Sequence, residues 1–192
     1  MATRIAVIDN RIPDQAGWMT LLLDSDVVGA SRTINIGHGD SQNAIVSRIS
    51  SAISGVSGPI KLDLISHGSP GLLPGSTVNT FTLSLGSPGL YNHPASLGAW
   101  ATLSGRLAKI RIYACGVESD LYGEAFSNPA SRQTQHELMA GIASTTGAEV
   151  KYSLQTYSGD TWTRGTSEFH SPDRMSSSVF VVGSDGSRRQ IR

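Results

Sequence analysis

The chain has 192 residues, which is enough for one domain with its own hydrophobic core. Its 15 Lys and Arg residues balance its 15 Asp and Glu residues, so it lacks the basic field that holds nucleic acid. One cysteine excludes an internal disulfide, and the absence of a signal-like or membrane-spanning apolar run leads us to expect a cytoplasmic protein with no membrane partner.

Short apolar runs alternate with amphipathic segments along the chain. Runs such as 5–8 predict buried strands, and the apolar spacing of Ile45 and Ile49 predicts a helix. The Pro- and Gly-rich stretch 69–89 predicts a small β-hairpin or an irregular crossover. The expected elements are strands over 4–9, 32–36, 60–68, 108–116, 148–154 and 178–182, helices over 12–23, 41–53, 94–107 and 133–145, and a loop over 117–132 with a breaker at Asn128-Pro129.

This alternation predicts an α/β fold, a three-layer α/β/α sandwich with a mainly parallel central sheet and helices on both faces. We expect a single domain over residues 1–192, with its core over about 4–162 and a C-terminal edge strand and tail over 163–192. In such folds reactive groups gather at the carboxyl ends of the strands. Two chemically notable residues, His67 and Cys115, stand at such ends.

His67 and Cys115 have the chemistry of an acyl-transfer site. A cysteine attacks as the thiolate, and a histidine that titrates near neutral pH can take the thiol proton and return it to a leaving amine. Gly68 follows the histidine, and its N–H together with that of Cys115 can serve an oxyanion. A lone Cys or His is more often a buried or solvated residue. The pair at two strand ends is what favours catalysis.

The segments Ser66-His67-Gly68 and Ala114-Cys115-Gly116, each closing an apolar strand, resemble the caspase-like cysteine peptidases. That superfamily includes caspases, metacaspases, clostripain, gingipains, separase and bacterial CHAT proteases. With the segments Thr145–Val150 and Gly159–Trp162, the chain is also similar to an uncharacterised caspase-like domain of large bacterial surface proteins. The resemblance covers roughly residues 5–162.

The resemblance implies a cysteine endopeptidase that cleaves a protein or peptide substrate through an acyl-enzyme, without metal or cofactor. His67 is similar to the family's catalytic histidine and Cys115 to its nucleophile, and Gly68 and Cys115 would supply the oxyanion donors. Self-cleavage as activation, and a role in bacterial defence or regulated cell death, are further implications. The alternative is a catalytically inactive caspase-like interaction module. The sequence leaves the oligomeric state open.

Four residues near the two strand ends are candidates for selecting the P1 side chain of a substrate. Caspases carry Gln two residues before the cysteine, whereas this chain carries Tyr113. Asp63 on the His67 strand, with Glu118 and Asp120 after Cys115, could favour a basic P1 residue. The competing interpretation is that all three carboxylates are solvated charges.

Other motifs in the chain are incomplete. His38-Gly39 also follows a strand, and is the rival candidate for the catalytic histidine. The stretch from Gly37 hints at a dinucleotide loop, but Gln42 stands at the third glycine position. His136-Glu137 begins a zinc-protease helix that lacks its second histidine.

Overall fold

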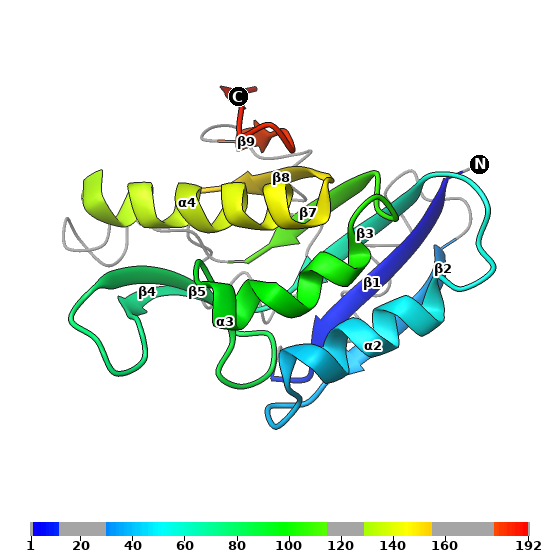
Figure 1. Ribbon diagram of the computed structural model, residues 1–192, viewed down its shortest axis with the longest axis horizontal. Coiled ribbons are helices and arrows are strands. Elements are labelled where there is room, and N and C mark those ends of the chain that lie inside the picture. The colour runs from blue at the N-terminus through cyan, green and yellow to red at the C-terminus, as the bar shows by residue number, and fades with distance from the viewer. Residues whose placement is uncertain (1, 12–29, 115–128, 155–178, 192) are drawn as a thin grey trace, which may run out of the picture.

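The computed structural model describes residues 2–11, 30–114, 129–154 and 179–191 (Figure 1). In these ranges, seven strands form one main sheet with the order β10-β9-β8-β7-β3-β1-β2. The strands are β1 (Thr3–Asp9), β2 (Ala30–Ile36), β3 (Ile60–Ile65), β7 (Lys109–Tyr113), β8 (Glu149–Ser153), β9 (Val179–Val182) and β10 (Arg188–Gln190).

The sheet is mostly parallel, as the sequence predicts. β2, β1, β3, β7 and β8 pair in parallel, whereas β9 and β10 add as antiparallel strands at one edge. The chain goes from β1 to β2 on one side and then to β3 on the other side of β1. The strand order therefore reverses between β1 and β3, and ligands of open α/β sheets bind outside the carboxyl ends of the strands at such a point.

A second, antiparallel sheet follows β3 directly. It consists of β4 (Gly68–Leu72), β5 (Asn79–Leu83) and β6 (Leu90–Tyr91), in that order. The predicted hairpin within 69–89 is confirmed as β4–β5, and β6 is an addition that the sequence did not reveal. Because β4 begins at Gly68, the turn that carries His67 joins the two sheets.

Four helices, one of them a 3₁₀ helix, flank the main sheet in the described ranges. Helix α2 (Gln42–Ala52) begins at Ser41, whose hydroxyl accepts the Ala44 N–H at 3.3 Å. The single helix expected over 94–107 is instead a short α3 (Pro94–Leu97) and a 3₁₀ helix, η1 (Gly98–Leu103). The change falls at Gly98, a weak helix former.

The longest helix, α4 (Pro129–Thr146), starts earlier than predicted. Asn128-Pro129 was expected to break the chain within a loop, but Pro129 is the first helical residue. Proline suits that position because its missing N–H has no partner there in any helix. At the other end Gly147 has φ +71° and donates its N–H to Ala143 O at 2.8 Å, so the predicted stop is confirmed.

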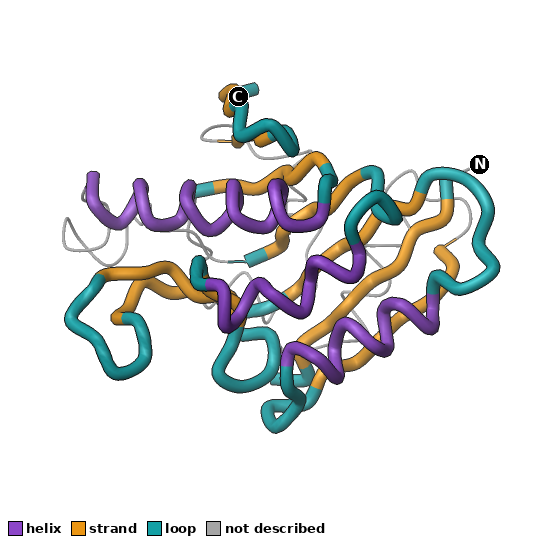
Figure 2. Tube along the Cα trace, viewed as in Figure 1, coloured by secondary structure: helices purple, strands orange, loops and turns teal. Residues whose placement is uncertain are grey.

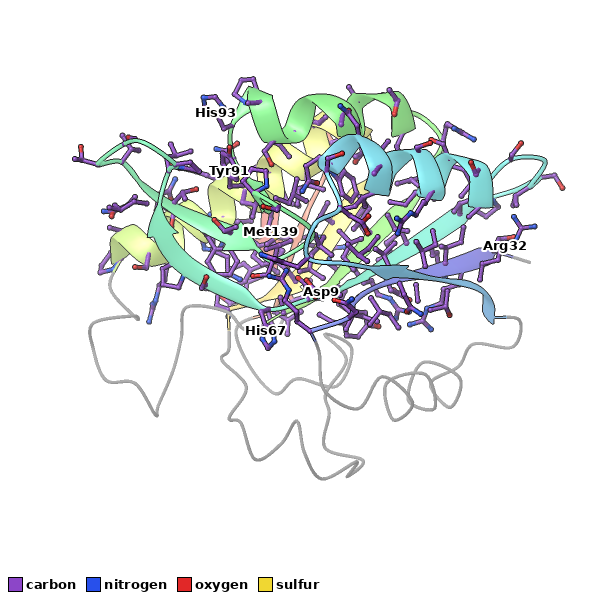
Figure 3. All side chains as sticks on the ribbon, turned by 90° about the horizontal axis from the view of Figure 1, so that it is seen from below. Asp9, Arg32, His67, Tyr91, His93 and Met139 are labelled. Carbon is purple, nitrogen blue, oxygen red and sulfur yellow. The ribbon has the colours of Figure 1, made fainter. Side chains whose placement is uncertain are left out.

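The hydrophobic core lies between the sheet and these helices. Figure 3 shows α2, α3 and α4 on the same face of the sheet, and the tube in Figure 2 shows α2 and α4 running roughly along the strands. Leu62 and Leu64 of β3 face this core, whereas Asp63 between them faces the other side, because side chains alternate along a strand. The helix predicted over 12–23 lies outside the described residues, so a third layer stays a prediction.

Candidate active site

The carboxyl ends of β1, β3 and β7 form the edge where the candidate site lies. Ile65 of β3 pairs with Ile8 on one side and with Tyr113 on the other. His67 follows two residues after Ile65, and Figure 3 shows it near Asp9, the last residue of β1. The predicted histidine therefore stands at the sheet edge where the strand order reverses.

Backbone hydrogen bonds hold the His67 turn on both sides. The Ser66 N–H donates to Tyr113 O at 3.1 Å, which continues the β3–β7 pairing one step beyond the strands. The Ser84 N–H, just after β5, donates to His67 O at 2.8 Å. The Ser66 hydroxyl also donates to His67 O, at 3.0 Å. The position of His67 thus depends on both sheets.

The Gly68 N–H, the expected oxyanion donor, faces away from β5. Pairing in the β4–β5 ladder alternates, and Pro70, which pairs with Phe81, has no N–H to donate. The residues of β4 that bond to β5 are therefore the odd-numbered ones, consistent with the His67 O bond to Ser84. The main-chain N–H and C=O of Gly68 therefore point away from β5.

Cys115, the predicted nucleophile, lies outside the described residues, as do Glu118 and Asp120. Strand β7 ends at Tyr113, and Ala114, which follows it, is buried. Along the chain Cys115 follows Tyr113 by two residues, as His67 follows Ile65, the partner of Tyr113.

Asp63 lies inside the protein rather than at a substrate pocket. Its carboxylate is fully buried and forms ion pairs with Arg4 and with Arg111, whose Nε is 2.8 Å from Asp63 Oδ1. Two cationic partners satisfy the carboxylate, so it is not available to a substrate side chain. We therefore assign Asp63 to the interior of the fold.

Tyr113 belongs to the same buried network. Its hydroxyl accepts Arg4 Nη2 at 3.1 Å, and the Arg111 guanidinium carbon lies 5.7 Å from the centre of its ring. Tyr113 is 3% exposed. Tyr113, two residues before Cys115, is therefore part of the buried polar network around Asp63.

Sequence reasoning missed the pair formed by Asp9 and Arg11 at the end of β1. Asp9 is fully buried, and its carboxylate accepts the Arg11 backbone N–H at 2.8 Å and Arg11 Nε at 2.9 Å. Hydrogen bonding to Asp9 raises the pKa of Arg11 above its ordinary value. The sequence feature that could have revealed this pair is Asp9 itself, an acidic residue that ends the apolar strand β1.

His38, the rival histidine, is held by Arg11. Its Nδ1 lies 3.0 Å from Arg11 Nη1. A guanidinium only donates hydrogen bonds, so this nitrogen accepts and the proton of the neutral ring is on Nε2.

Other features of the described residues lie away from this edge. A surface pocket of about 300 Å³ is lined by α4 and the β9–β10 hairpin, with His136, Glu137 and Arg188 among its residues. No three His, Cys, Asp or Glu side chains in the described ranges are grouped as metal ligands would be. Nor is any helix in those ranges both long and apolar enough to cross a membrane.

The protein is thus a mixed α/β protein with a mostly parallel sheet. His67 lies at the edge of that sheet where the strand order reverses between β1 and β3. Residues 5–166 match the family described as Domain of unknown function (DUF4347), and the chain belongs to that family. No curated protein and no solved structure matches the chain.

Proposed function

We propose that this protein is a caspase-like cysteine endopeptidase with His67 as the base and Cys115 as the nucleophile. The observation that carries the proposal is the β3–β7 register. Ile65 pairs with Tyr113, and the Ser66 N–H still donates to Tyr113 O at 3.1 Å. His67 and Cys115 each follow this paired step at the same distance along the chain, which favours their meeting at one edge.

The proposed reaction begins when His67 takes the thiol proton of Cys115. The thiolate adds to the scissile carbonyl carbon, and the resulting oxyanion accepts hydrogen bonds from the N–H groups of Gly68 and Cys115. The carbon–nitrogen bond then breaks, and the amine leaves with the proton from His67. Water, activated by His67, hydrolyses the thioester and restores the thiol.

Substrate selection remains with Glu118 and Asp120 in this proposal, since Asp63 is committed to two arginines. The proposed substrate is a protein or peptide, bound at the sheet edge where the strand order reverses. A reducing compartment such as the cytoplasm, which we propose as the location, keeps a thiol nucleophile in its reduced form.

The test is covalent labelling of the purified full chain with peptides that carry a thiol-reactive ketone electrophile. We expect modification of Cys115, located by mass spectrometry, and at least about a hundredfold slower labelling in His67→Ala, the scale of general-base catalysis. His38→Ala tests the rival histidine and should label at least about ten times faster than His67→Ala. Equal labelling rates in wild type and His67→Ala would contradict the peptidase and indicate the inactive interaction module instead.

A further inference from the structure

The chain of contacts that begins at Asp9 leads to the main chain of His67. Asp9 closes β1 with its carboxylate fully buried, and it binds Arg11 through the backbone N–H and the guanidinium. The Asp9 carboxylate is shielded from water, whereas the Arg11 side chain is 34% exposed. The several charge-assisted hydrogen bonds to one buried carboxylate fix the orientation of the guanidinium.

Arg11 also contacts the segment that follows β5. Its Nη2 donates to Ser84 O at 2.5 Å, and the N–H of the same Ser84 donates to His67 O at 2.8 Å. One residue thus separates the Arg11 guanidinium from the main chain of His67. The link joins the end of β1 in the main sheet to the end of β5 in the second sheet.

The guanidinium joins three loops at once. Besides Asp9 and Ser84 it reaches His38 in the loop after β2, with Nη1 at 3.0 Å from Nδ1. The planar guanidinium has five N–H donors in fixed positions, so it can donate to three partners at once. A lysine ammonium on its flexible stem cannot reach the same three partners in that geometry.

The His67 turn needs such support because it lies between two sheets. The chain leaves β3 at Ile65 and enters β4 at Gly68, so only two residues make the passage. One side of the turn is anchored to β7 through Ser66, and the other to Ser84. Fixing Ser84 therefore limits how far His67 can move relative to the end of β7.

We propose that Asp9 and Arg11 are positioning residues for His67, acting through Ser84 to hold the imidazole at the distance and angle that proton transfer requires. This inference rests on the proposed peptidase function. The two residues touch no reacting atom. Their contribution is pre-organisation, and displacements of about 1 Å in a catalytic group can cost about a hundredfold in rate.

Arg11→Lys is the informative variant. The lysine keeps a cation beside the buried Asp9, so the fold is retained, but it loses the simultaneous bonds to Ser84 and His38. Arg48→Lys is the matched control, because Arg48 also binds a carboxylate, Asp40, and a backbone carbonyl, Asn35 O, and its contacts do not reach Ser84 or His67.

Labelling of Cys115 by the peptide electrophile is measured for wild type, both lysine variants and His67→Ala, as the maximal rate and the half-saturating concentration. We expect Arg11→Lys to lower the maximal rate by about tenfold to a hundredfold, the cost of a misplaced base, with half-saturation unchanged. Arg48→Lys should match wild type. Thermal unfolding of each variant shows how much is folded.

The pH profile tests whether Arg11 acts through the base. With iodoacetamide, the rate ratio of wild type to Arg11→Lys should shrink toward one at high pH, because the thiol there ionises without its base. The thermal unfolding curves identify a partly unfolded variant, because its exposed thiol also reacts with iodoacetamide. A pH-independent ratio, or equal rates for Arg11→Lys and Arg48→Lys, overturns the inference alone. If wild-type labelling does not depend on His67, the proposed function fails and this inference fails with it.

Discussion

The buried charge network around Asp63 makes a strong prediction about stability. Asp63→Asn keeps the size of the side chain but removes the charge that neutralises Arg4 and Arg111. Asp63 is fully buried, and the two arginine side chains are 4% and 12% exposed. Loss of one partner from such a buried pair costs about 3–5 kcal/mol, because the remaining charges stay desolvated and unpaired. The asparagine NH₂ group also cannot accept from either guanidinium.

Urea unfolding followed by tryptophan fluorescence measures this loss. With a slope of about 2 kcal/mol per molar urea, the midpoint should fall by roughly 1.5–2.5 M. Glu149→Gln is the control. Its ion pair with Lys109 joins neighbouring strands in the same sheet, but the side chains are 37% and 31% exposed. An exposed pair of this kind contributes at most about 1 kcal/mol.

Two results would refute the interpretation of Asp63 as an interior residue. The first is a midpoint for Asp63→Asn that matches Glu149→Gln within error. The second is that Asp63→Asn is as stable as wild type but is no longer labelled by peptides with a basic P1 side chain. That outcome would restore Asp63 as a substrate contact.

Two further predictions concern a turn and a histidine. Gly86 has φ +69°, and a Cβ there would lie 2.1 Å from Asp40 O, so Gly86→Ala should cost about 2 kcal/mol or more. Gly55→Ala, at φ +73° with open space around it, should cost only about 1 kcal/mol in the same urea assay, and equal losses would contradict the clash. Burial, and then the charge of Arg188, lower the pKa of His136 from 6.5 to about 4. The unfolded chain therefore binds more protons between these values, so stability should fall as pH drops from 6.5 to 4, and His136→Gln should lessen that slope in thermal melts. An NMR titration that finds the His136 ring charging near pH 6.5 would contradict this second prediction.

The strands and helix ends were predictable because their causes are local. An apolar run such as 5–8 has few ways to avoid water other than a buried strand. A serine before an amphipathic segment and a glycine after one act within a single turn, as Ser41 and Gly147 show. Pro129 shows the limit of this reasoning, since proline favours both a break and a first helical turn.

What the sequence by itself determined, then, is most strands of the main sheet, their mainly parallel arrangement, and a histidine just after the carboxyl end of β3, whereas β6 and β10 were not predicted. Only the tertiary structure decided which charges are interior. Asp63 meets an arginine 59 residues away, and Arg11 meets a carbonyl 73 residues away. The physical reason is that a carboxylate's environment depends on strand register and loop packing between distant segments, whereas a strand's existence depends on its own few residues.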